Sequence, residues 1–379
     1  MEMMLSEEQE AVRMAARDFA REELLPGVIE RDEHQQFAKD EIKKLGELGF
    51  MGIMTATQYG GAGMDTISYV LAIEEISKID ASVSVCMSVN NSLVCWGLEA
   101  YGTEAQKQKY LAPLASGEKI GAFCLSEPEA GSDATSQHTT AEDKGDYYLL
   151  NGTKNWITNG NSASIYLVIA QTHREKGHKG INVLIVEKDM PGFTVGKKEN
   201  KMGIRSSDTH ALMFQDVKVP KENRIGEDGF GFKFAMQTLN GGRIGIAAQA
   251  LGIAAGAYEL AHQYAKERKS FGVPIIEHQA IQFKLADMAT KIEAARLLVY
   301  KAAFLKDQHQ DYTMAAAMAK LYASTVAMEV TTEAVQVHGG YGFVKEFHVE
   351  RLMRDAKITQ IYEGTSEIQK MVIGRELTK

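Results

Sequence analysis

The placement of proline divides this 379-residue chain into three regions. Four prolines fall between residues 113 and 220 and none follows residue 274; the full set is Pro26, Pro113, Pro128, Pro191, Pro220 and Pro274. Proline interrupts helices, whereas long stretches without it permit long helices. Because the chain is also too long for one compact core, we predict an N-terminal helical domain over residues 1–118, a middle β-domain over 119–226 and a C-terminal four-helix-bundle domain over 227–379.

Apolar periodicity agrees with two helical regions. Ser6 and Gln9 have the spacing of a helix start, and apolar residues follow at helical period. Similar patterns, broadest and richest in alanine toward the C-terminus, cover residues 41–48, 66–79, 90–101, 232–268, 280–306 and 313–338. The last three are long enough to predict a helical bundle.

The middle region changes to a β pattern. Residues 147–150, 165–170, 181–186 and 211–219 are short β-rich runs, and Asn151-Gly152 after the first predicts a hairpin turn. We expect a small antiparallel barrel or sandwich here. The fold class is therefore mainly α with a middle β-domain.

Composition excludes several classes of protein. The net charge of −8 argues against nucleic acid or an anionic membrane as a bulk partner, although local cations could still bind a polyanion. Three cysteines without CxxC spacing indicate a reducing compartment. The histidines form no cluster with metal-ligand spacing, so we predict no metal site. The N-terminus is acidic and no run of about 18 apolar residues stands out. We expect a soluble cytoplasmic protein without membrane insertion.

The segment from Arg354 to Glu367 carries the strongest chemical signal. In it, Glu363 precedes Gly364, and Thr365 offers a cap for a following helix. Glycine lets a backbone approach a ligand closely, so the carboxylate of Glu363 could reach a substrate carbon. On spacing alone, a solvated loop residue is the commoner alternative for Glu363, since surface carboxylates are rarely catalytic.

Two segments of the middle region could surround a flat ring. Residues 123–133 mix hydroxyl groups, glycine and proline, and could offer N–H groups and hydroxyls to a cofactor. Trp156 stands beside Thr158 and could stack on such a ring. The alternatives are an ordinary strand-to-loop connection and a core tryptophan.

Three further positions could hold phosphate. Arg268 ends a helix, where it could pair with a pyrophosphate or simply suit the helix C-terminus. Gly339 and Gly340 permit close backbone approach but are also explained by a helix C-cap. Arg243 follows two glycines and could bind a phosphate or an adenine edge, or be an exposed arginine at a kink.

Together, in this order, these segments resemble the acyl-CoA dehydrogenase family over essentially the whole chain. The pieces that carry the resemblance are Ser126-Glu127-Pro128, Ala130-Gly131-Ser132-Asp133, Trp156-Ile157-Thr158, Glu267-Arg268 with Phe271-Gly272, Gln336 with Gly339-Gly340, and Arg354-Asp355-Ala356 with Ile361-Tyr362-Glu363-Gly364-Thr365. Residues 87–93 and 242–245 are most similar to the short-chain, butyryl-CoA dehydrogenase branch.

The resemblance implies an FAD-dependent enzyme of fatty acid β-oxidation, with Glu363 as the catalytic base. It implies that FAD contacts Phe123, Leu125, Ser126, Ser132, Trp156, Ile157, Thr158, Arg268, Phe271, Gln279, Gln336, Gly339, Gly340, Thr365 and Glu367. It implies that the acyl-CoA contacts Ser132, Asn240, Arg243, Tyr362 and Gly364. The ADP half of FAD would be held largely across a subunit interface of a homotetramer, and electrons would pass to an electron-transferring flavoprotein.

Two features refine these expectations. Other branches of the family place the base at the residue just before the helix arginine. Here that residue is Gly242, which precedes Arg243 and has no side chain. Of the two positions that the family uses for the base, only the one occupied by Glu363 therefore carries a carboxylate. No Lys or Arg stands between Lys78 and Lys107, which leaves the expected pocket segment without a cation for a second carboxylate. We therefore expect an uncharged short chain such as butyryl.

Two positions depart from the common family pattern. Asn240 stands where the family often has aspartate, and Glu129 stands where glycine is common.

Several alternatives stay open at this point. The substrate could be a branched short-chain or another acyl-CoA, and an acyl-CoA oxidase would share the fold and the base but pass electrons to oxygen. A nitroalkane-oxidising relative would be expected to carry aspartate where Glu363 stands. A relative kept only as a flavin-binding scaffold would bind FAD without reacting with any acyl-CoA.

Overall fold

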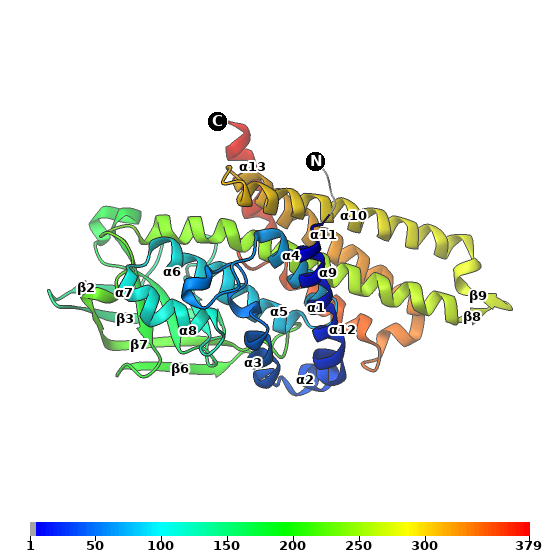
Figure 1. Cartoon of the computed structure of the whole chain (residues 1–379), viewed down its shortest axis with the longest axis horizontal. Helices are drawn as coiled ribbons and strands as arrows, with labels where there is room; N and C mark the ends of the chain where they lie inside the picture. The colour runs from blue at the N-terminus through cyan, green and yellow to red at the C-terminus, as the bar shows by residue number, and fades with distance from the viewer. Residues whose placement is uncertain (1–4) are drawn as a thin grey trace.

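The computed structural model describes residues 5–379 and shows a β-domain packed at one end of a long helical body (Figure 1). The predicted mainly-α fold with a middle β-domain is confirmed. The N-terminal helices are α1 (Glu7–Phe19), α2 (Val28–His34), α3 (Lys39–Glu47), α4 (Thr66–Ser77), α5 (Ala81–Ser88), α6 (Trp96–Tyr101), α7 (Glu104–Gln106) and α8 (Ala112–Ala115). Helix α1 begins with the reciprocal cap between Ser6 and Gln9 that the sequence predicts.

A π-helical turn over Val89–Cys95 interrupts the helix expected over residues 90–101. The buried amide of Asn90 donates to the carbonyls of Met51 and Leu114, and that of Asn91 donates to the carbonyl of Phe50. These bonds satisfy backbone groups outside the helix, and they fix the wider turn in place.

The β-domain holds a seven-stranded sheet in the order β1-β4-β2-β3-β7-β6, with β5 paired to β4. Its strands are β1 (Gly121–Cys124), β2 (Thr140–Asp143), β3 (Tyr147–Thr158), β4 (Ile165–Gln171), β5 (Ile181–Glu187), β6 (Phe193–Lys198) and β7 (Thr209–Pro220). Most neighbours are antiparallel as predicted, but β1 and β2 each pair with β4 in parallel. Strands β4 and β5 are buried along almost their whole length.

The hairpin predicted at Asn151-Gly152 is wrong, because β3 runs straight through these residues. They form a bulge at which the register with β7 shifts. Asn151 exchanges two hydrogen bonds with Asp216 of β7, of 3.1 and 2.8 Å, and Gly152 adopts a φ of 143°. A Cβ at Gly152 would overlap Thr139, so glycine is needed for close approach rather than for a turn.

The C-terminal region is a bundle of long helices. Its elements are α9 (Gly231–Glu267), β8 (Lys269–Ser270), β9 (Val273–Pro274), α10 (Gln279–Asp307), α11 (Thr313–His338), α12 (His348–Ile358) and α13 (Ser366–Leu377). Helix α9 runs from the β-domain to the far end of the molecule, where β8 and β9 lie (Figure 1). A Cβ at Gly252 or Gly256 would overlap the backbone of Glu74 or Lys78, so these glycines let α4 pack closely on α9.

Helix α12 joins all three regions through buried polar contacts. Arg351 donates to the carbonyl of Ile79, at 2.7 Å, and pairs with Asp355 at 3.1 Å. Asp355 also accepts a hydrogen bond from the backbone N–H of Ile204 in the middle region. The end of α12, and the loop that follows it, are thereby fixed relative to the rest of the chain.

Two helical segments, Ala81–Tyr101 and Gly231–Glu267, are long and apolar enough to span a membrane by length and composition alone. Both are mostly buried inside the fold. Core helices of this kind pass the same test.

Candidate active site

Glu363 lies in the short loop between α12 and α13. Its φ is 52° and that of Gly364 is 91°, so two consecutive residues have left-handed backbone. This conformation is unfavourable for a glutamate and is held by its surroundings. Helix α13 then begins with Thr365, whose hydroxyl accepts from the N–H of Ile368 at 3.4 Å, which confirms the predicted cap.

The carboxylate of Glu363 points at Gly242 of α9. A Cβ built on Gly242 would overlap Oε2 of Glu363 and come within 2.8 Å of Leu93, which belongs to the π-helical turn. Oε2 is buried and has no hydrogen-bond partner among residues 5–379. A buried carboxylate oxygen without a partner is costly, and such groups occur where chemistry needs them.

Burial raises the pKa of Glu363 to about 7. The nearby charges of Lys320 and Arg243 act against this effect and lower the pKa. The side chain as a whole is half-buried, so a ligand in the adjoining space could still reach it. A carboxylate whose pKa lies near neutrality is well matched to general-base catalysis.

Arg243 is buried at the same place in α9, so the alternative of an exposed arginine at a kink is wrong. Its Nη1 donates to Oδ1 of Asn240, whose amide donates to the hydroxyl of Thr313 at 3.3 Å. Its Nε has no partner among the described residues, and burial lowers the pKa of the guanidinium. Arg243 therefore keeps donor capacity for a ligand.

Tyr362 precedes Glu363 and is fixed by α9. Its hydroxyl donates to Oε1 of Gln249, and the amide of Gln249 donates to the carbonyl of Ala81 at 2.8 Å. Tyr362 thus ties the loop to the start of α5, and its hydroxyl is already engaged within the protein.

The expected ring-binding residues gather on β1 and β3. Phe123 and Leu125 are nearly buried, and the carbonyl of Ser126 accepts from the N–H of Asn155 at 2.9 Å. Trp156 is 60% exposed and has a φ of 60°, so it is not a core aromatic. Its neighbours Ile157 and Thr158 end β3.

A buried ion pair holds these two segments together. Nζ of Lys154 lies 2.8 Å from Oε1 of Glu127, and it also donates to the carbonyl of Leu125 at 3.0 Å. Glu127 accepts further hydrogen bonds from the N–H groups of His138 and Thr139. The loop after β1 is therefore anchored on β3, next to Trp156.

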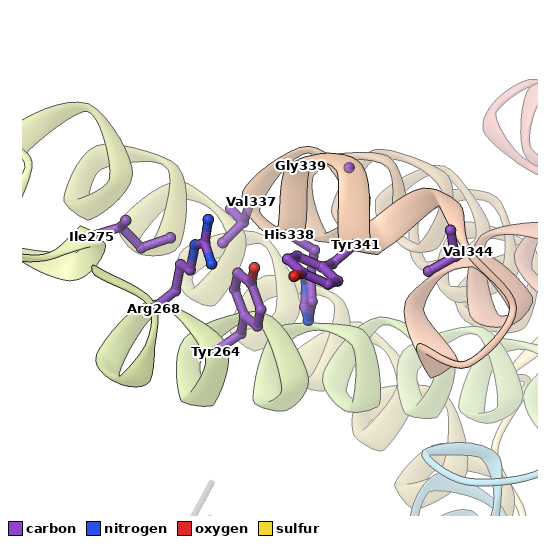
Figure 2. A pocket seen from close by; sticks show the side chains of 9 residues that line it. Tyr264, Arg268, Ile275, Val337, His338, Gly339, Tyr341 and Val344 are labelled. Atoms are coloured by element: carbon purple, nitrogen blue, oxygen red, sulfur yellow. The ribbon is translucent and has the colours of Figure 1, made fainter. Parts of the chain in front are cut away.

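A second site lies at the far end of α9. A cleft of about 570 Å³ is lined by Tyr264, Arg268, Ile275, Val337, His338, Gly339, Gly340, Tyr341 and Val344 (Figure 2). His338 stacks on Tyr264 at a centroid distance of 4.3 Å, and the Arg268 guanidinium lies 5.6 Å from the ring centroid of Tyr341. A Cβ at Gly339 or Gly340 would meet no atom within 4 Å, so the backbone here is open to a ligand.

The structure brings the expected residues into separate groups. Gly242 and Arg268 are 26 positions apart on α9, which is about 40 Å along a helix. The cleft at Arg268 and the carboxylate of Glu363 therefore lie at distant places in one chain. The remaining expected contacts, Ser132, Phe271, Gln279, Gln336 and Glu367, are exposed.

Sequence reasoning missed several residues that shape the site. Lys320 of α11 is fully buried, and its Nζ donates to the carbonyl of Gly364 at 2.6 Å. Gln249 and Lys154 are likewise fully buried; Gln249 fixes the loop of Glu363 and Lys154 fixes the segment after β1. A lone lysine in an alanine-rich apolar stretch was the available signal for Lys320.

Family models match all three regions of the chain. They are the acyl-CoA dehydrogenase N-terminal domain over residues 6–118, the middle domain over 122–217 and the C-terminal domain over 229–378.

Individual relatives match over full length. The short-chain specific acyl-CoA dehydrogenase of Clostridium acetobutylicum is 53% identical and covers 100% of both chains. The structure of butyryl-CoA dehydrogenase from Megasphaera elsdenii is 52% identical, with a TM-score of 0.99 over 100% of both chains. A chain from a structure described as the electron transferring flavoprotein of Acidaminococcus fermentans, in work on electron bifurcation, is 54% identical with a TM-score of 0.99 over 100% of both chains. The chain therefore belongs to the acyl-CoA dehydrogenase family of oxidoreductases.

Proposed function

We propose that this protein dehydrogenates a short-chain acyl-CoA to the trans-2-enoyl-CoA, with Glu363 as the base. The observation that carries the proposal is the buried, unpartnered Oε2 of Glu363 beside Gly242. A carboxylate with a pKa of about 7 can take the weakly acidic α-proton of a thioester. A positioned base contributes roughly 10²–10⁴-fold to the rate of such a step.

Backbone geometry supports stabilisation of the charge that this step creates. Removal of the α-proton places negative charge on the thioester oxygen. The N–H of Glu363 donates to no protein atom among residues 5–379, so it is available to that oxygen. A donor already fixed by the loop stabilises the developing charge without reorganisation.

The chain's residues fit FAD in two places. Trp156, Thr158 and the loop at Ser126 would hold the flavin ring, and bound flavin supplies the acceptor for the β-hydrogen and its electron pair. Arg268, Gly339 and Gly340 would hold the pyrophosphate of another subunit's cofactor, since they lie about 40 Å from Gly242 in the same chain. This division supports an oligomer, which we propose to be a homotetramer.

The surroundings of Glu363 favour an uncharged acyl tail. Leu93 of the π-helical turn lies beside Gly242, and the segment from residue 79 to 106 holds no Lys or Arg. A second carboxylate on the acyl chain would lie buried without a counterion, which is strongly unfavourable. Butyryl-CoA therefore fits better than a dicarboxylyl thioester, and the names of the relatives agree with this choice.

An electron-transferring flavoprotein is the proposed acceptor of electrons, and the cytoplasm the proposed location. The proposed acceptor is supported by the similarity of this chain to a chain in a structure described as an electron transferring flavoprotein. The proposed location rests on three free cysteines, all buried, which suit a reducing compartment.

Anaerobic mixing of the yellow holoenzyme with acyl-CoAs of four to eight carbons, straight and branched, tests the proposal. Butyryl-CoA should bleach the flavin band fastest, and the Glu363→Gln variant should bleach at least 10²-fold more slowly. A variant that bleaches as fast as the parent would remove Glu363 from the mechanism. Hydrogen peroxide formed in air, at the rate seen with a dye acceptor, would favour an oxidase instead.

A further inference from the structure

We propose that Lys320 is a positioning residue that holds the loop of the catalytic base from behind and places a buried positive charge next to it, without touching the substrate. The inference rests on the proposed role of Glu363. Lys320 lies on α11, on the protein side of the loop, and is fully buried.

The first contact is with the peptide that follows the base. Nζ of Lys320 donates to the carbonyl of Gly364 at 2.6 Å, and the amide of Gln369 donates to the same oxygen at 2.8 Å. Glu363 and Gly364 both have left-handed backbone, which is unfavourable for a glutamate. A charge-assisted hydrogen bond on this carbonyl holds the turn in the conformation that aims the carboxylate at Gly242.

The second contribution is charge. No salt bridge within 4.0 Å pairs Lys320 with a carboxylate among residues 5–379, although Lys is rarely buried without such a partner. Burial lowers the pKa of Lys320 to about 8, and the negative charge that most opposes this effect is Glu363. In return, Lys320 is the largest influence that lowers the pKa of Glu363.

Other charged and titratable groups face this pair and must be kept constant in any test. They are Arg243 on α9, Tyr69 on α4, Tyr362 in the loop and Glu367 on α13. Arg243 is the one other cation that lowers the pKa of Glu363 in the part of the chain that the structure describes. Lys320 and Arg243 thus partly offset a desolvation that favours the protonated form of Glu363.

Lys320→Met and Gln369→Leu form a matched pair for the test. Each removes one hydrogen bond from the carbonyl of Gly364, and only the first removes a positive charge. Gln369→Leu also removes the 3.3 Å hydrogen bond to the carbonyl of Glu363, so it is the more severe structural control. An apolar side chain of similar length in place of a buried ammonium is often tolerated by the fold. Lys320→Arg restores the charge and serves as the rescue.

The readouts are the pH dependence of flavin bleaching by butyryl-CoA and an infrared titration of the protonated carboxyl band of Glu363. The band is identified by its loss in Glu363→Gln, so this readout does not depend on turnover. We expect Lys320→Met to raise both midpoints by about one pH unit or more. Its bleaching rate should fall about fivefold at pH 7 and recover at pH 9, because the remaining base is then ionised.

The outcomes separate this inference from the proposed function. Unchanged midpoints in Lys320→Met, with a rate loss equal to that of Gln369→Leu at every pH, would show a purely structural role and overturn the inference. A shifted infrared midpoint in a protein that no acyl-CoA bleaches would support the inference and reject the proposed function. If Lys320→Met does not retain FAD, an unshifted infrared midpoint in Lys320→Gln overturns the inference in the same way.

Discussion

The carboxylate of Glu363 fills the space that a side chain at Gly242 would need. The two residues lie 121 positions apart in sequence and meet because the loop after α12 is held against α9. The absence of a side chain at one position is therefore as much a part of the site as the carboxylate at the other.

Replacement of Gly242 by alanine tests this relationship. The new Cβ would displace the carboxylate by a fraction of an ångström to an ångström, and such shifts reduce rates by about 10²-fold. We expect that loss in the bleaching rate with butyryl-CoA, with the flavin spectrum retained. Gly241→Ala is the control, because a Cβ there meets only the carbonyl of Ser92, at 3.9 Å. Equal activity of the two variants would contradict the assignment.

The reaction should depend on pH through the base. The pKa of Glu363 is about 7, and only the carboxylate form can accept the α-proton. The value of kcat/KM should therefore fall about tenfold per pH unit below 7 and level off above it. Stopped-flow bleaching between pH 5 and 9 measures this profile. A midpoint near 4.5, the ordinary value for a glutamate, would mean that the carboxylate is solvated in the free enzyme.

The ionisation of Glu363 should also affect stability: catalysis needs the ionised carboxylate, whereas the folded state favours the protonated carboxyl. The unfolded chain releases the proton of Glu363 near its ordinary pKa of 4.5, whereas the folded chain keeps it to about 7. Folding stability is therefore lost as the pH rises through this window. Glu363→Gln should melt at a higher temperature than the parent at pH 8 and at the same temperature near pH 4.5.

Glu367→Gln is the control for that measurement. Backbone N–H and hydroxyl donors lower the pKa of exposed Glu367, so its contribution to stability is present above the ordinary pKa and is lost as the pH falls. The variant should not gain thermal stability at pH 8. A gain equal to that of Glu363→Gln would attribute the effect to net charge alone.

The buried pair of Lys154 and Glu127 should be needed for folding and for cofactor retention. Lys154→Met leaves the Glu127 carboxylate buried without its cation, which destabilises by about 3–5 kcal/mol. Lys144→Met breaks an exposed pair with Glu142 and should leave stability nearly unchanged, because solvent screens such pairs. Denaturant unfolding and FAD content after gel filtration measure both. Recovery in the double variant Lys154→Met with Glu127→Leu would confirm the cause.

The sequence predicted those elements whose signals are local. Helix α11 spans residues 313–338 as its apolar face indicated, and Thr365 caps α13 through its own hydroxyl. Glu363 could also be singled out from the sequence as a candidate, because this carboxylate-glycine pair stands in a motif that resembles a known family.

The features that escaped prediction depend on partners distant in sequence. Asn151-Gly152 has the composition of a hairpin turn, yet the side chain of Asp216 on a neighbouring strand makes it a bulge. Lys320 looks like an ordinary helix cation until α13 and the base loop cover it. Local pattern gives secondary structure, but burial of a polar group is decided by tertiary packing.

The contacts of Arg351 and Asp355 make the position of Glu363 a property of the whole chain. Helix α12 is anchored on the carbonyl of Ile79 and on the N–H of Ile204, which belong to the N-terminal and middle regions. A substitution in either of those regions can therefore move the carboxylate of Glu363 without touching the loop that carries it.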